Sequence, residues 1–201
     1  LKMGFVQDVE RIIESADPNR QLVMFSATTN QDVLTVSWKY QREPIEIVVQ
    51  AQAENKPNIT QYIVESDPKQ KYEHLLYLLD SDRYKRTMIL CNTKDMTARL
   101  CERLKKAGYS AECLHGDVRQ AIRDKVMSDF RKGEFEILVA TDVAARGIDV
   151  DDVEAVFNYD LPDKQEFYVH RIGRTGRAKR AGVSFSFVSF RDSIRMDEIL
   201  K

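Results

Sequence analysis

Residues 59–201 alternate between short apolar runs and segments whose apolar residues recur at helical spacing. The apolar runs predict strands, and the spacing between them predicts helices, for example around Leu75 and Leu79. Regular β-α alternation with short connections predicts an α/β domain, a parallel sheet with helices on both faces. The predicted strands are ITQYIVE (59–65), MILC (88–91), SAECL (110–114), EILVAT (136–141), VEAVFNY (153–159) and GVSFSFVSF (182–190).

Local residues predict where several helices begin and end. Asp67 followed by Pro68 predicts a helix start, and Asp163 predicts the cap of a short helix that runs to about Ile172. Gly133 predicts the end of the helix before it, because glycine readily adopts the left-handed conformation that closes helices. A last helix is predicted to run to the end of the sequence.

Residues 1–50 do not continue this pattern. The polar stretch 51–58 contains a proline and predicts a linker. We therefore expect three parts: a segment 1–50, the linker 51–58 and a domain 59–201. The elements predicted in the first part are a helix around Val9, Ile12 and Ile13, a buried strand LVMF (22–25), a helix through Trp38 and a strand EIVV (46–49).

Composition narrows the possible functions. The formal net charge of -1 over 201 residues gives no global basic field, so a nucleic-acid surface would have to be a local patch. Cys91, Cys101 and Cys113 are an odd number and form no CxxC pair, which argues against a disulfide framework or a zinc site. Cys91 and Cys113 lie in apolar runs, so we expect buried thiols in a reducing cytosol. No apolar run approaches about 18 residues and no signal peptide is visible, so we expect neither a membrane span nor secretion.

The segment HRIGRTGR (170–177) is the sharpest chemical signal. Two glycines frame Arg174, so a tight turn can present Arg174 and Arg177 on a loop. The planar guanidinium suits phosphate because it forms two parallel hydrogen bonds. A lone arginine there would more often be a cation placed near a helix C-terminus. The repeated arginine–glycine spacing, together with the other motifs, favours phosphate binding.

Two further segments follow predicted strands. In ATDVAARGID (140–149), backbone N–H groups and Thr141 suit a phosphate, and Asp149 suits a ribose hydroxyl, because ligands of open parallel sheets bind beyond the carboxyl ends of strands. Each half of this segment, taken alone, is also explained by an ordinary turn between a strand and a helix. In ILCNTK (89–94), Thr93 is either a helix cap, a phosphate ligand or both.

The helix predicted after LHGDVRQAIR (114–123) carries Gln120 and Arg123 beside its apolar stripe. Such a pair can hold a sugar-phosphate backbone, although a solvated helix face is the ordinary explanation for the pair alone. SAT (26–28) follows the strand LVMF and is a weak signal by itself.

These motifs and YDLP (159–162) occur in the order and at the spacing of the DEAD-box helicases, and the sequence resembles that family over essentially its whole length. The resemblance implies a RecA-like, P-loop NTPase-type fold and two such domains that clamp ATP and RNA between them. The opening LKMGF resembles the stretch that follows the Asp-Glu-Ala-Asp tetrad. We therefore expect the sequence to hold the end of the first domain and the whole second domain.

The resemblance also implies roles for individual residues. Arg174 and Arg177 would be arginine fingers on the γ-phosphate, Asp149 would hold the ribose, and Gly147 would allow close approach of the backbone to the nucleotide. His170 and Arg171 would link the nucleotide site to the SAT motif and the RNA side. Ser26 and Thr28 would couple hydrolysis to strand separation. The RNA backbone would be contacted by Thr93, Gly116, Arg123 and Thr141, with Gln120 and Arg146 positioning these residues. Further contacts would come from Lys94, Asp142, Asp160 and Gly173.

The sequence departs from the family at Leu90, where phenylalanine is usual, which puts in doubt a ring–arginine contact to the last motif. It also contains neither GxxxxGK[ST] nor D-E-A-D. The phosphate cradle and the Mg²⁺ ligands are therefore expected in the missing first domain. A non-catalytic module that binds RNA or protein, and a related translocase acting on DNA, remain alternatives. His170 favours the DEAD-box group, because related groups usually carry glutamine there.

The first segment raises a question of assembly. A strand such as LVMF needs neighbours on both edges, and most of the first domain is not part of this sequence. We expect residues 1–50 to be ordered only against a partner surface, most simply a second copy of the chain.

Overall fold

The computed structural model describes residues 5–26, 31–48, 58–145, 153–176 and 180–200. The chain divides into two compact units, Leu1–Ala51 and Gln52–Lys201, and each is described by itself. The predicted linker 51–58 lies outside the described residues except for its last position, Asn58.

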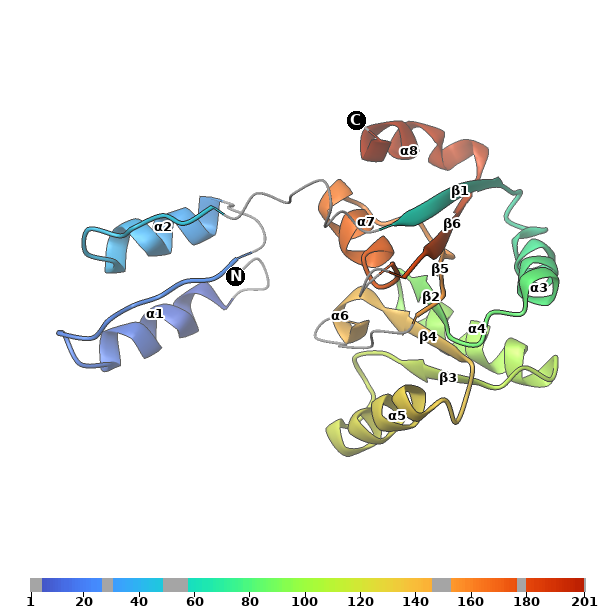
Figure 1. The fold of residues 1–201 in the computed structure, drawn as a ribbon, viewed down its shortest axis with the longest axis horizontal. Coiled ribbons are helices and arrows are strands. Elements are labelled where there is room, and N and C mark those ends of the chain that lie inside the picture. Colours follow the sequence, from blue (N-terminus) through green and yellow to red (C-terminus); the bar gives the residue numbers. More distant parts are fainter. Residues whose placement is uncertain (1–4, 27–30, 49–57, 146–152, 177–179, 201) are drawn as a thin grey trace. The chain divides into compact units, whose positions relative to one another are not determined.

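The second unit is a six-stranded sheet with the order β1-β6-β5-β2-β4-β3, in which every pair is parallel (Figure 1). The α/β class predicted from the alternation is confirmed. Its elements are β1 (Ile59–Glu65), α3 (Lys71–Asp82), β2 (Thr87–Cys91), α4 (Lys94–Lys106), β3 (Ala111–Leu114), α5 (Gln120–Lys132), β4 (Ile137–Thr141), α6 (Asp142–Ala145), β5 (Ala155–Asn158), α7 (Gln165–Ile172), β6 (Gly182–Val188), a 3-10 helix (Phe190–Asp192) and α8 (Ser193–Leu200).

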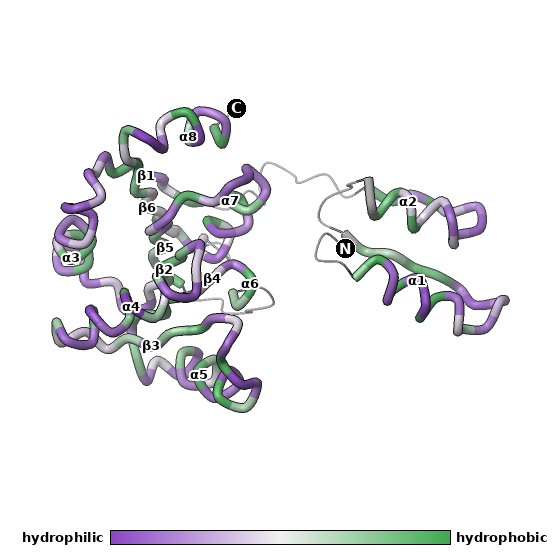
Figure 2. The backbone as a smooth tube through the Cα atoms, turned by 180° about the vertical axis from the view of Figure 1, so that it is seen from behind, coloured by the Kyte–Doolittle hydropathy of each residue, from purple (hydrophilic) through white to green (hydrophobic). Residues whose placement is uncertain are grey.

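Both faces of the sheet are covered, because successive residues of a strand point to opposite sides. Ile89 and Cys91 pack in one core with α3 and α4, whereas Met88 and Leu90 pack in a second core with α5. Burial on both faces explains why the central strands are uninterrupted apolar runs (Figure 2). A third cluster joins α7 and α8 through Tyr168, Met196 and Ile199 with Leu161 and Val188.

Several predicted boundaries hold and others shift. Thr93 caps α4 by accepting a hydrogen bond from the Met96 amide at 3.2 Å, and Gly133 closes α5 with φ 77°. Asp67 instead caps a turn, since its carboxylate accepts from the Lys69 amide and α3 begins only at Lys71. Asp163 does not cap α7, which begins after Lys164 without a side-chain cap. The last strand ends at Val188, where Ser189 and Asp192 bond reciprocally and start the 3-10 helix.

The first unit contains two helices, α1 (Val6–Ser15) and α2 (Gln31–Tyr40). They are joined by hydrogen bonds from Lys39 to Glu10 at 2.9 Å and from Tyr40 to Glu14 at 2.6 Å. The predicted strands LVMF and EIVV are wrong for the described residues 22–25 and 46–48, which form no strand. A strand needs a hydrogen-bonded neighbour, and the described residues of the first unit form no sheet beside Phe25, whose side chain is 94% exposed.

Across the described parts of the chain, no helix combines the length and apolar character needed to cross a membrane. The three thiols are free, with Cys91 and Cys101 buried and Cys113 half-buried.

Candidate functional site

The strand order brings several predicted site residues together. β2 lies between β5 and β4, so the carboxyl ends of these three strands are neighbours. Such a position, where connections leave a parallel sheet in opposite directions, is where ligands of this architecture bind. Asn92 follows β2, Asp142 follows β4 and Asp160 follows β5 closely. The candidate site is therefore built on three chain segments that are distant in sequence.

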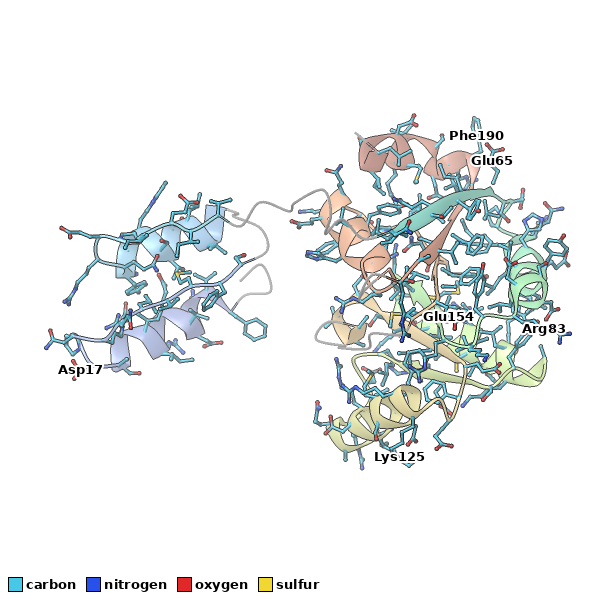
Figure 3. All side chains as sticks on the ribbon, in the orientation of Figure 1. Asp17, Glu65, Arg83, Lys125, Glu154 and Phe190 are labelled. Atoms are coloured by element: carbon cyan, nitrogen blue, oxygen red, sulfur yellow. The ribbon has the colours of Figure 1, made fainter. Side chains whose placement is uncertain are left out.

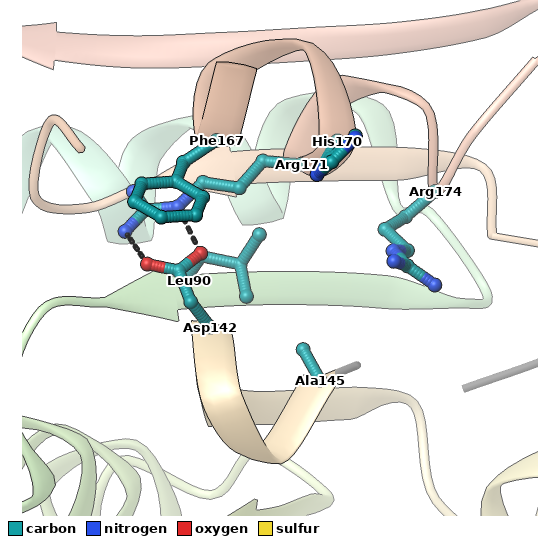
Figure 4. Close-up of a pocket in the computed structure, with 7 residues that line it drawn as sticks. All are labelled: Leu90, Asp142, Ala145, Phe167, His170, Arg171 and Arg174. Atoms are coloured by element: carbon teal, nitrogen blue, oxygen red, sulfur yellow. Dashed lines mark hydrogen bonds and ion pairs between the residues drawn. The ribbon is translucent and has the colours of Figure 1, made fainter. Parts of the chain in front are cut away.

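Arg171 of α7 joins all three segments. Its side chain is 1% exposed and makes a forked pair with Asp142, with Nε–Oδ1 and Nη2–Oδ2 distances of 2.6 Å (Figure 4). Nη1 donates to the carbonyl of Asp160, and Nη2 donates to Asn92 Oδ1 at 2.7 Å. A buried guanidinium is tolerated only when it is paired and its N–H groups are bonded, as they are here.

Asp160 forms the second layer of this arrangement. Its carboxylate accepts from Lys71 Nζ and from the Asn92 backbone amide, both at 3.1 Å. The Lys71 ammonium also lies 4.5 Å from the centre of the Tyr159 ring, and burial raises the pKa of Tyr159 to about 12. Lys71 is a site residue that the sequence reasoning missed, because a lysine in the first turn of a helix carries no distinguishing pattern.

Arg171 and His170 of α7 differ in their surroundings. The resemblance assigns it, with His170, to a link between the nucleotide site and the SAT motif. In the structure the Arg171 side chain is enclosed within the second unit, where it holds Asn92, Asp142 and Asp160. His170 is exposed on the same helix, so it is the member of the pair that faces outward.

A small pocket lies beside this network (Figure 4). Its volume of about 20 Å³ holds roughly one water molecule, so the described residues enclose no nucleotide-sized pocket there. Arg174 reaches the same pocket but lies apart from the Arg171–Asp142 pair. The residues that line it are Leu90, Asp142, Ala145, Phe167, His170, Arg171 and Arg174.

The turn that carries Arg174 is anchored by Thr175 and by close packing at two glycines. Thr175 is 1% exposed and donates its hydroxyl to the carbonyls of Val153 and Glu154. Gly176 has a backbone φ of 69°, which residues with a side chain rarely adopt. A Cβ atom at this position would lie 2.6 Å from Cγ1 of Ile59. A Cβ on Gly182 would collide with the Thr175 hydroxyl. The glycines thus let the turn pack directly against the starts of β1 and β6.

The predicted RNA-contacting residues occupy strand ends and helix starts. Thr93 follows β2 and caps α4, so the cap interpretation is confirmed for this residue. Thr141 ends β4, is 9% exposed and accepts from the Ala144 amide at 3.4 Å. Gly116 follows β3 in open space, since a Cβ added to it would have no neighbouring atom within 4 Å. These three residues therefore lie at or just after the carboxyl ends of β2, β4 and β3, which are neighbours in the sheet.

The helix α5 adds two polar side chains. Arg123 Nη2 donates to the Ala144 carbonyl at 2.5 Å and so ties α5 to α6. Gln120 donates to Asp124 on the same helix at 2.7 Å. Lys94 pairs with Asp117 at 2.8 Å, and this hydrogen bond raises the pKa of Lys94 and lowers that of Asp117.

The remaining predicted site residues fall elsewhere. Ser26 is exposed in the first unit, whose placement against the second is not described. Among the described residues, no group of three His, Cys, Asp or Glu side chains could hold a metal ion. The predictions that lie outside the described residues concern Thr28, Arg146, Gly147, Asp149 and Arg177.

Comparison with known proteins identifies the class. Residues 70–179 match the family described as "Helicase conserved C-terminal domain". The chain is 43% identical over 192 residues to the DEAD-box ATP-dependent RNA helicase CshA of Geobacillus kaustophilus, covering 96% of this chain and 41% of that protein. It is 41% identical over 200 residues to the ATP-dependent RNA helicase FAL1 of Saccharomyces cerevisiae, covering 99% of this chain and 50% of that protein.

Solved structures of related proteins also match the fold of this chain. S. cerevisiae Dbp5 bound to RNA and ADP BeF3 matches with a TM-score of 0.85 at 33% identity, covering 98% of this chain and 52% of that one. The E. coli DEAD-box protein SrmB, bound to the regulator of ribonuclease activity RraA, matches with a TM-score of 0.65 at 35% identity, covering 69% of this chain and 82% of that one.

The chain therefore belongs to the family of the helicase conserved C-terminal domain, and its RecA-like fold is confirmed. Within that family it is a helicase C-terminal domain of the DEAD-box type. It spans 41% of the length of CshA and half the length of FAL1.

Proposed function

We propose that the chain is the C-terminal part of an ATP-dependent DEAD-box RNA helicase, which supplies arginine side chains to ATP and grips the RNA backbone during duplex unwinding. The observation that carries the proposal is the anchored turn that holds Arg174 beside Asp142 and Ala145. The CshA and FAL1 relatives are named ATP-dependent RNA helicases, and Dbp5 was solved with RNA and ADP BeF3.

Arg174 and Arg177 are proposed as the groups that stabilise charge on the γ-phosphate. A guanidinium suits this role because its planar fork can bond two phosphate oxygens at once. Asp149 is proposed to hold the ribose of ATP, and Gly147 is proposed to let the backbone approach the nucleotide closely. The Mg²⁺ that accompanies ATP is proposed to be held by the first RecA-like domain, because the sequence contains neither GxxxxGK[ST] nor D-E-A-D.

The RNA clamp is proposed along the carboxyl ends of β2, β3 and β4. Hydroxyl and amide groups at helix starts bind phosphate oxygens, as Thr93 and Thr141 can do in addition to capping. His170, Ser26 and Thr28 are proposed to connect this clamp with ATP and the first domain. The residues proposed for the clamp are Thr93, Gly116, Gln120, Arg123, Thr141 and Arg146.

The chain by itself is expected to bind single-stranded RNA weakly and without sequence preference, because contacts to phosphate carry no sequence information. Affinity should fall with added salt by about 0.7 log unit per log unit of salt for each phosphate neutralised. Arg123→Ala should weaken binding about equally for unrelated RNA sequences and reduce the salt slope. Fluorescence anisotropy with two labelled RNAs over a salt series measures both quantities.

Arg131→Ala is the matched control, because Arg131 is an exposed arginine near the other end of α5. Arg123→Lys keeps the charge and separates loss of charge from loss of the bond to Ala144. Strong preference for one RNA sequence, abolished by Arg123→Ala, would contradict the proposal. Equal binding and equal ATPase stimulation by DNA, in a protein that includes the first domain, would favour the DNA translocase. RNA binding without any ATPase there would favour the non-catalytic module.

The first unit is proposed to associate with a second copy of the chain through its exposed apolar side chains. Phe25 is 94% exposed, Ile45 87% and Ile47 82%, which is a large apolar surface for so small a unit. Sedimentation velocity of the whole chain, compared with a variant that begins at Asn55, should show a concentration-dependent dimer only for the whole chain. Two monomeric species at high concentration would rule out the intermolecular contact.

A cytoplasmic location is proposed from the cysteines. Cys91, Cys101 and Cys113 are free thiols, which suits a reducing compartment.

A further inference from the structure

A hollow of about 470 Å³ opens at the amino ends of β1 and β6. It lies on the face of the sheet opposite α7, because Gln61 bonds to Tyr168 of α7 and the next residue, Tyr62, points the other way. The candidate site leaves this hollow unused. The residues that line it are Thr60, Tyr62, Asp82, Tyr84, Glu154, Ala181, Gly182, Val183 and Phe185, and Figure 3 labels Glu154 among them.

Stacked aromatic rings form one wall of the hollow. The Tyr62 ring stacks on Phe185 with centroids 5.2 Å apart and 16° between the planes, and Phe185 stacks on Phe157 at 4.8 Å and 16°. Exposure rises along the stack, from 0% at Phe157 through 5% at Phe185 to 49% at Tyr62. The stack therefore begins in the core and ends in the half-exposed ring of Tyr62, which packs on Phe185.

Two carboxylates lie beside these rings. Asp82 accepts a hydrogen bond from the Tyr84 hydroxyl at 2.9 Å, and Glu154 accepts from the Lys85 backbone amide at 2.8 Å. Burial, together with the Asp82 hydrogen bond, raises the pKa of Tyr84, so the hydroxyl stays protonated and Asp82 stays the acceptor. Among the described residues that line the hollow none is basic. The wall is thus aromatic and negatively charged.

We propose that this hollow binds the guanidinium of an arginine side chain carried by a protein partner. A planar cation is attracted to the face of a tyrosine ring and can donate N–H groups to carboxylates at the same time. Arginine suits this better than lysine, because its guanidinium is flat and more weakly hydrated. A phosphate backbone would be repelled by Asp82 and Glu154. The volume exceeds what one guanidinium needs and leaves room for neighbouring residues of a peptide.

The site is tested by NMR titration of the chain with a five-residue glycine peptide that has arginine at its centre. Matched peptides carry lysine, or citrulline, which has nearly the same shape as arginine but no charge. The arginine peptide should shift the ring resonances of Tyr62, Tyr84 and Phe185 and bind at least about fivefold more tightly than the citrulline peptide. Free L-arginine should bind more weakly than the peptide, because its own carboxylate meets Asp82 and Glu154.

Substitutions test whether the residues of the hollow bind the arginine peptide. Tyr62→Ala and Glu154→Gln should each lower the affinity for the arginine peptide by at least about fivefold. Tyr62→Phe should bind the peptide nearly as tightly as the unchanged chain, because it keeps the ring. Tyr77→Ala and Glu73→Gln are matched controls on exposed residues of α3 that do not line the hollow. Equal binding of the arginine and citrulline peptides, or binding unchanged by both Tyr62→Ala and Glu154→Gln, overturns the proposal. Tighter binding of free L-arginine overturns the assignment to a protein partner.

Discussion

Replacement of Arg171 by alanine is expected to lower the free energy of unfolding of the second unit by about 3–5 kcal/mol. The guanidinium is 1% exposed and joins Asn92, Asp142 and Asp160. Its removal leaves the Asp142 carboxylate without its charged partner and leaves the Asn92 amide oxygen without its donor. Removal of one partner of a buried ion pair costs more than the pair itself contributes. Asp142 is 27% exposed, so water relieves part of this cost and the lower end of the range is expected.

Urea unfolding followed by circular dichroism measures this change. Arg171→Lys keeps the charge but not the fork, so it should recover only part of the loss. Arg99→Ala is the matched control, because Arg99 is exposed on α4 and its change should stay within about 0.5 kcal/mol. A loss below about 1 kcal/mol for Arg171→Ala would mean that the buried network contributes little, contrary to the range expected for a broken pair.

The sequence predicts the sheet well because strand burial and helix period are local patterns. Uninterrupted apolar runs mark β2 and β4, and Thr93 and Gly133 lie where the caps of α4 and α5 are found. One failure arises where a local signal competes with a neighbouring turn, since Asp67 bonds to the Lys69 amide and delays the start of α3. Another concerns LVMF, which has no strand beside it within the described residues of the first unit.

The candidate site is predictable only in part. The resemblance implies that Arg171 links the nucleotide site to the SAT motif, but the sequence cannot tell an arginine that reaches outward from one that is buried. Arg171 is buried because its partners follow three different strands, up to 79 residues away in sequence, and only the strand order brings them together. The aromatic hollow has the same origin, since it depends on the register that sets Tyr62 of β1 beside Phe185 of β6.

Arg174→Ala is expected to lower kcat for RNA-stimulated ATP hydrolysis at least about a hundredfold, in a longer protein that includes the first RecA-like domain. Arginine fingers of related nucleotidases contribute about 10³–10⁵ in rate, and only where a phosphate cradle and Mg²⁺ are in place. RNA affinity without nucleotide should change much less, because Arg174 is proposed to contact the γ-phosphate of ATP and not the RNA backbone. Steady-state ATPase assays with saturating RNA measure kcat.

Arg191→Ala is the matched control, because Arg191 is exposed in the 3-10 helix that follows β6. Arg174→Lys should restore little activity, because an ammonium lacks the planar fork that bonds two phosphate oxygens. Thr175→Val should lower kcat as well while leaving RNA affinity unchanged, since Thr175 holds the turn through its bonds to Val153 and Glu154. The 201-residue chain alone should not hydrolyse ATP, because the cradle is missing from its sequence. Robust RNA-stimulated hydrolysis by that chain, or full activity of the longer protein with Arg174→Ala, would show that the γ-phosphate does not depend on this arginine.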